Sequence, residues 1–109
     1  MKAADAYLVI TNLPDRDSAA KLAHALIEGH LAACINVLSP CRSVYRWQGK
    51  TEDAEEFPML IKTTRTRYPE VEAAIRARHP YELPEIIAVA LTGGLPAYLG
   101  WVDSETRPA

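Results

Sequence analysis

The spacing of apolar and polar residues changes along the chain, and each change predicts a different element. Residues 7–13, YLVITNL, are apolar and rich in β-branched side chains, which is typical of a buried strand. In residues 14–29 the apolar positions instead fall at the spacing of one helical face: Ala19, Leu22, Ala23, Leu26 and Ile27. We expect Asp15 or Asp17 to cap this helix at its start, and Gly29 to end it in a left-handed conformation.

Residues 31–64 predict two strands joined at Gln48-Gly49-Lys50. The first strand alternates between two faces, with Val44 and Arg46 on one and Ser43, Tyr45 and Trp47 on the other. Pro40 breaks the first strand and Pro58 the second, and we expect an edge or a bulge at each.

This hairpin is long for the size of the protein. Residues 32–48 in extended form would span about 55 Å, whereas a domain of this length has a radius of gyration of about 13 Å. The hairpin must therefore fold back at Pro40 or project from the body. Because its tip carries Tyr45 and Trp47, which are costly to leave in water, we expect it to project into another subunit.

The second half of the chain predicts a helix, a strand and a final helix. Residues 67–79 are helical, with Pro69 in the first turn and Pro80 ending the helix. Residues 85–91, EIIAVAL, are almost continuously apolar, which favours a central strand. After a turn at 93–94 comes a short helix. The order β-α-β-β-α-β with a terminal helix predicts an α+β protein of the ferredoxin-like sandwich type.

Length and charge limit the classes of function. The 109 residues fit a single domain, 1–109, and the net charge of −2 argues against nucleic acid or an anionic membrane as a partner. No apolar run is long enough to cross a membrane, and the N-terminal segment lacks a secretory pattern, which predicts a cytoplasmic protein. Cys34 and Cys41 should then stay reduced. Their spacing matches no metal motif, so we interpret Cys34 as a core residue and Cys41 as more exposed.

Five segments together resemble the CutA divalent-cation-tolerance proteins. They are LAACIN at 31–36, SVYRWQGK at 43–50, KTT at 62–64, HPYELPEI at 79–86 and YLGW at 98–101. The resemblance runs in order from about residue 7 to residue 103. It implies a ferredoxin-like fold, a tight homotrimer whose long strands pair between subunits, and an architecture similar to that of the PII signalling proteins. Its implied role is homeostasis of copper and other divalent metals.

His79 has two interpretations. It follows a predicted helix, whose last carbonyls favour a protonated imidazole, or it is a metal ligand or pocket residue. Members that resemble a copper-binding pattern carry a cysteine late in the first strand and a histidine before the HPY motif, where this chain has Thr11 and Arg78. Of that copper(II) set only His79 remains. His24 and His30 are interpreted as surface residues.

The aromatic residues also have two interpretations. Tyr45, Trp47, Tyr81 and Trp101 either pack in the core and interface or line a cleft between subunits together with Glu56, Lys62 and Glu85. Glu56 and Lys62 face the same way if their strand has no bulge. The alternative for the charged residues is a structural ion pair.

The resemblance implies a homotrimer that responds to and binds divalent metal. Because no set of residues matches a recognisable catalytic motif, we expect it to act without catalysis and to need no cofactor. A PII-like small-molecule-binding signalling trimer, a partner-docking scaffold and a small hydrolase are the alternatives.

Overall fold

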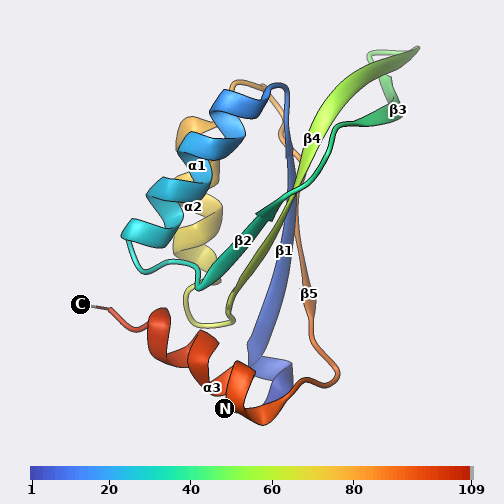
Figure 1. Cartoon of the computed structure of the whole chain (residues 1–109). Helices are drawn as coiled ribbons and strands as arrows, with labels where there is room; N and C mark the ends of the chain where they lie inside the picture. The colour runs from blue at the N-terminus through green and yellow to red at the C-terminus, as the bar shows by residue number, and fades with distance from the viewer. Residues whose placement is uncertain (109) are drawn as a thin grey trace.

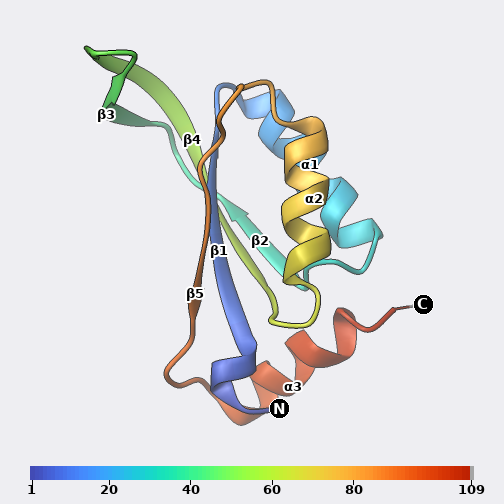
Figure 2. The ribbon, with the colours of Figure 1, turned by 180° about the vertical axis from the view of Figure 1, so that it is seen from behind.

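The chain forms a five-stranded antiparallel sheet that carries two helices on one face and a third helix across one end (Figures 1 and 2). The computed structural model describes residues 1–108. After a short 3-10 helix at Ala3–Asp5 the elements are β1 (Ala6–Leu13), α1 (Arg16–Glu28), β2 (Cys34–Val37), β3 (Cys41–Trp47), β4 (Lys50–Thr64), α2 (Tyr68–Arg78), β5 (Ile86–Ala90) and α3 (Pro96–Glu105).

The strand order β2-β4-β1-β5, with β3 continuing along β4, confirms the predicted ferredoxin-like arrangement. Since β2 and β3 both pair with β4, they act as one strand that is interrupted at residues 38–40. The interruption at Pro40 was therefore predicted correctly. The hairpin made by β3 and the first half of β4 projects beyond the helices (Figure 1), and the molecule is 44 Å along its longest axis.

The core lies between the sheet and the helices α1 and α2. Its buried members are Val9, Leu13, Ala19, Leu22, Leu26, Ala32, Phe57, Met59, Ile61, Val71 and Ile75. Strand alternation explains the members that come from the sheet, because every second residue of β1 and β4 points to this face. The members from α1 and α2 lie on the helical faces that pack against it. Ile27, which was predicted on the inner face of α1, is instead 39% exposed because it lies at the margin of the apolar stripe.

The start of α1 is as expected, but its end is different. Asp15 caps the helix by accepting a hydrogen bond from the backbone N–H of Ser18 at 2.7 Å. Gly29 has a φ of −82°, and the left-handed residue is His30, with a φ of 57°. The N–H of Leu31 then bonds to the carbonyl of Leu26, which completes a Schellman motif around His30. The prediction for Gly29 was wrong by one residue.

Strand β4 passes through Pro58 without a break, contrary to expectation. Its register with β1 is continuous from Thr64 opposite Ala6 to Phe57 opposite Leu13. The Pro58 carbonyl accepts the Leu38 N–H at 2.9 Å, so the N–H that proline lacks would have pointed at the interrupted segment. Residues 38–40 stand opposite residues 57–58, and the extra residue therefore lies in the partner strand rather than in β4.

Strand β5 is at the edge of the sheet, where a central strand was expected. Among residues 1–108 it pairs only with β1, and residues 87–90 are exposed. Ile87 and Val89 are each 49% exposed although the segment is apolar. The side chains of β5 are therefore apolar although most of them are not buried within one protomer.

Candidate functional site

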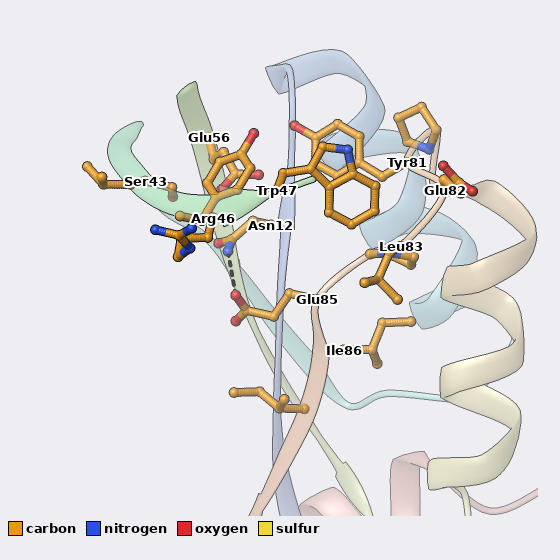
Figure 3. Close-up of a pocket in the computed structure, with 15 residues that line it drawn as sticks. Asn12, Ser43, Arg46, Trp47, Glu56, Tyr81, Glu82, Leu83, Glu85 and Ile86 are labelled. Carbon is orange, nitrogen blue, oxygen red and sulfur yellow. Dashed lines mark hydrogen bonds between the residues drawn. The ribbon is translucent and has the colours of Figure 1, made fainter. Parts of the chain in front are cut away.

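A groove of about 1000 Å³ separates the projecting hairpin from the segment that joins α2 to β5 (Figure 3). One wall comes from β3 and from Glu56 in the middle of β4, and the other from residues 80–87, with Asn12 at the end of β1 between them. Two aromatic side chains of β3, Tyr45 and Trp47, line the groove together with Tyr81. Three carboxylates also line it: Glu56, Glu82 and Glu85.

The hairpin register places the aromatic and acidic residues on the same face. Cys41 pairs with Glu56, and Trp47 pairs with Lys50. Because directly opposed residues share a face and side chains alternate along a strand, Tyr45 and Trp47 lie on the side of Glu56. Gln48 and Gly49, with φ angles of 51° and 79°, form the two-residue turn that matches the twist of the strands. The predicted turn position is confirmed.

His79 connects the groove to the core. It follows α2 in extended conformation and is 8% exposed. Its Nε2 lies 2.6 Å from the backbone carbonyl oxygen of Asn12, and the Tyr81 backbone N–H lies 3.2 Å from its Nδ1. A carbonyl only accepts and an amide N–H only donates, so Nε2 carries the proton and Nδ1 accepts. The ring's one free lone pair is therefore in use.

The Tyr81 side chain lies between His79 and Glu56. Its ring centroid is 4.7 Å from that of His79, at an interplanar angle of 52°. Burial raises the pKa of the Tyr81 phenol, and the charge of the adjacent Glu56 carboxylate raises it further. Glu56 itself is only 7% exposed. The contacts through His79 and Tyr81 thus run from the end of β1 to a buried carboxylate.

The other side of the groove is held by Asn12 and Glu85. The Asn12 side-chain amide donates a hydrogen bond to Glu85 Oε1 at 3.2 Å, as the dashed line in Figure 3 marks. Asn12 was not among the predicted site residues. It follows a buried strand and has no local signal, because its two partners lie 67 and 73 residues away. Glu82 and Leu83, which also line the groove, lie within the HPYELPEI segment but were not singled out.

Five of the predicted pocket residues line this groove: Tyr45, Trp47, Glu56, Tyr81 and Glu85. His79 does not line the groove itself, but its ring packs against Tyr81, which does. The structure does not bring Lys62 or Trp101 to it. Trp101 lies on α3 at the far end of the sheet, where its ring is 5.5 Å from that of Tyr98.

Lys62 does share a strand face with Glu56, as the continuous register of β4 requires. Six residues of strand, however, separate them by about 20 Å. The Lys62 ammonium instead contacts the side-chain oxygen of Asn36 and lies 3.9 Å from Cys34 Sγ. Cys34 is half-buried on the face away from α1 and α2, so its interpretation as a core residue was wrong: alternation places Ile35 in the core instead.

The positions compared with the copper pattern do not form a preassembled site. Thr11 is fully buried, and its hydroxyl has no hydrogen-bond partner among residues 1–108. Arg78 is exposed and has no lone pair to donate. Within the same residues, no three His, Cys, Asp or Glu side chains lie close enough to hold a metal ion. His24 and Cys41 are exposed, as predicted.

The chain matches the family model described as CutA1 divalent ion tolerance protein over residues 7–105. It is 37% identical over 99 residues to the divalent-cation tolerance protein CutA of Thermus thermophilus, covering 91% of this chain and 96% of that protein. Protein CutA of Arabidopsis thaliana, a chloroplastic protein, is 35% identical across 97% of this chain, which spans 58% of the plant protein's length.

Solved structures agree with these matches. The crystal structure of CutA from Xylella fastidiosa superposes with a TM-score of 0.92 at 42% identity, covering 94% of this chain and 99% of that one. A CutA from Archaeoglobus fulgidus, described as a periplasmic divalent cation tolerance protein, gives 0.91 at 34% identity, covering 94% and 99% of the two chains. In the part of the chain that the structure describes, no helix is both long and apolar enough to span a bilayer.

Proposed function

Because this chain belongs to the CutA1 divalent ion tolerance family, we propose that it acts in tolerance of divalent metal ions as a homotrimer that binds its ligand without transforming it. The observation that carries the trimer is the apolar surface that a single protomer leaves uncovered. That surface has two parts, the edge of the sheet at β5 and the projecting hairpin.

The edge strand β5 supports assembly because it combines unpaired backbone groups with apolar side chains. Ile87 and Val89 are each 49% exposed. Their partners across the sheet, Ile10 and Leu8, flank the core residue Val9 in β1, so alternation places them on the face opposite the core. An exposed apolar edge of this kind promotes uncontrolled pairing between chains unless it is covered. Closed symmetric association of identical chains covers it.

The hairpin supports the same conclusion. Val44 is 66% exposed, Tyr45 43% and Trp47 36%, on strands that project from the body. Large side chains of this type form the buried centres of protein interfaces. The exposed apolar surfaces support association with further copies of the chain. That the assembly contains three copies is what the family resemblance implies. A mass of one protomer in sedimentation equilibrium at micromolar concentration would overturn the trimer.

The metal part of the proposal assigns copper(II), or another divalent ion, to His79. Coordination at Nδ1 requires the imidazole to release the Tyr81 N–H, and His79 belongs to no group of three His, Cys, Asp or Glu side chains that could hold a metal ion within residues 1–108. We therefore expect binding to be weak unless a neighbouring subunit supplies further ligands.

Calorimetric titration of copper(II) into the purified protein tests this assignment. We expect measurable heat at micromolar protein, weaker binding after His79→Ala with an unchanged sedimentation profile, and no change after His24→Ala, which removes an exposed imidazole. The absence of heat, or an unchanged affinity in His79→Ala, would exclude this role for His79.

A PII-like ligand-binding trimer is the second candidate function, and the aromatic and acidic groove favours it over a scaffold or a small hydrolase. A pull-down with the assembled protein as bait tests the scaffold, and a screen against phosphate esters tests the hydrolase. Cytoplasmic localisation stays a prediction, since named relatives include chloroplastic and periplasmic proteins.

A further inference from the structure

We propose that the Lys62 ammonium pairs with the Glu85 carboxylate of a neighbouring copy of the chain, so that each contact between subunits contains this ion pair. The pair rests on the proposed trimer and adds the two surfaces through which its copies meet. One surface lies beside the sheet edge formed by β2, and the other begins at the opposite edge, formed by β5.

The sheet face opposite the core is apolar where two rows of paired residues cross it from β2 to β5, and we call these rows the bare face. One row is Cys34, Lys62, Leu8 and Val89, and the other is Asn36, Leu60, Ile10 and Ile87. An antiparallel sheet that faces water is usually polar on that side. Since α1 and α2 pack on the other face, we expect a second copy to cover the bare face.

Lys62 is the only charged side chain in these two rows, and it lacks an acidic partner in its own chain. Its ammonium contacts the side-chain oxygen of Asn36 and lies 3.9 Å from Cys34 Sγ. None of the ion pairs within residues 1–108 includes it. A cation that association removes from water is costly unless a carboxylate compensates it. The surface that covers the bare face should therefore bring a carboxylate to Lys62.

Glu85 of the same copy is too far away to supply this carboxylate. Lys62 pairs with Leu8, and Leu8 pairs with Val89, so two strand spacings and four residues separate Lys62 from Glu85. Together they place the two Cα atoms roughly 16 Å apart. The Lys62 ammonium also leans toward Asn36 in β2 and thus away from β5. A neighbouring copy can bring its own Glu85 to Lys62 from the β2 side.

Glu85 is the groove carboxylate best placed to meet another copy. It is exposed, directly precedes the edge strand β5 and accepts a hydrogen bond from the neutral Asn12 amide. Glu56 is instead buried and accepts the hydrogen bond of the Tyr81 phenol. Glu82 lies beside the end of α2, whereas Glu85 points toward Asn12 (Figure 3). Glu85 is thus the exposed acid that adjoins the open edge.

Symmetry favours contact between these two opposite edges. A closed ring of three copies joins each chain to its neighbours through two different surfaces. Lys62 leans toward the β2 edge and Glu85 adjoins the β5 edge, so the two charges belong to different surfaces. Head-to-tail association then gives every Lys62 one Glu85 as its partner and leaves neither charge uncompensated.

Charge reversal in the full chain tests the pair. Lys62→Glu and Glu85→Lys each bring like charges together, and each should raise the protein concentration at half-dissociation by at least about tenfold. The double variant Lys62→Glu/Glu85→Lys restores the pair with its signs exchanged and should return to within about threefold of the wild type. Analytical ultracentrifugation over a dilution series measures all four proteins.

Two controls separate the pair from net charge. Lys21→Glu makes the same change of charge on the exposed side of α1 and should leave dissociation unchanged. Glu82→Lys makes the same change of charge as Glu85→Lys and should not rescue Lys62→Glu. The pair is overturned if Glu82→Lys rescues as well as Glu85→Lys, or if the double variant dissociates as readily as the single ones.

Circular dichroism checks that each variant folds. If Lys62→Glu does not fold, Lys62→Gln and Glu85→Gln replace the reversals. Together they should then weaken the assembly by less than the product of their separate effects, and strictly independent effects would overturn the pair. A wild type that sediments as one protomer overturns the trimer and the pair together. An intact wild-type trimer that tolerates Lys62→Glu overturns the pair alone.

Discussion

The Nε2 atom of His79 donates a hydrogen bond to the backbone carbonyl of Asn12, 67 residues away in sequence and 2.6 Å away in space. This bond joins the end of α2 to the end of β1 and holds Tyr81 in the groove. His79 is thus a structural connection in the protomer, whatever it binds.

Replacing His79 by alanine should lower the free energy of unfolding by about 1–3 kcal/mol, because the Asn12 carbonyl and the Tyr81 N–H lose a buried partner. Urea unfolding followed by circular dichroism measures the change. His24→Ala is the matched control and should leave stability nearly unchanged, since His24 is exposed. Equal stability of His79→Ala and the wild type would show that the bond contributes nothing.

Replacing Trp47 by alanine should weaken the trimer by about 2–4 kcal/mol, because a large side chain is lost from the proposed interface. Analytical ultracentrifugation over a dilution series should show dissociation at higher protein concentration than for the wild type. Ile27→Ala removes a side chain of comparable exposure from α1 and should not shift the profile. An unchanged profile for Trp47→Ala would place the indole outside the interface.

Gly94→Ala should destabilise the fold by about 1–3 kcal/mol through overpacking. A Cβ at this position would lie 3.0 Å from Leu99 Cδ2, and Leu99 is a buried residue that cannot move aside freely. At Gly93 a Cβ would meet nothing within 4 Å, so Gly93→Ala should be neutral or slightly stabilising. Thermal unfolding measures both variants, and we expect the lower melting temperature for Gly94→Ala. Equal melting temperatures would contradict the packing argument.

The Tyr68 phenol should make the stability of the protein depend on pH in alkaline solution. The pKa of its phenol is raised from 10.0 to about 12, most of all by burial, and in part by the 2.8 Å hydrogen bond to Glu72 and the charge of that carboxylate. As the pH rises, the Tyr68 phenol is therefore deprotonated at a lower pH in the unfolded chain than in the folded protein. The stability that Tyr68 contributes is complete below pH 10 and is lost as the pH rises through about 12.

Between these two pH values we expect Tyr68→Phe to show a smaller fall in unfolding free energy than the wild type, as measured by urea titrations at several pH values. Glu72→Gln, which removes the carboxylate, should give an intermediate slope. Identical slopes in all three proteins would mean that other groups control alkaline unfolding.

Elements whose residues interact locally were predictable from the pattern of the sequence. The helical spacing of α1, an aspartate cap at its start (Asp15 or Asp17, of which the structure uses Asp15), the turn at Gln48-Gly49 and the interruption at Pro40 each depend on neighbours a few residues away. The end of α1 shows the limit of such reasoning, because a glycine was expected in the left-handed position that His30 occupies. Side-chain preference alone did not decide which of two adjacent residues turns the chain.

What the sequence determined by itself is the order of the elements and the alternation that places Tyr45 and Trp47 on one face of β3. The tertiary structure decided that β5 lies at the edge, that Lys62 stays about 20 Å from Glu56, and that Asn12 meets both His79 and Glu85. Periodicity records whether a residue is apolar, but not which molecule buries it or which distant residue it meets. Those relationships depend on strand register and on the closure of long loops, and both are settled only when the whole chain packs.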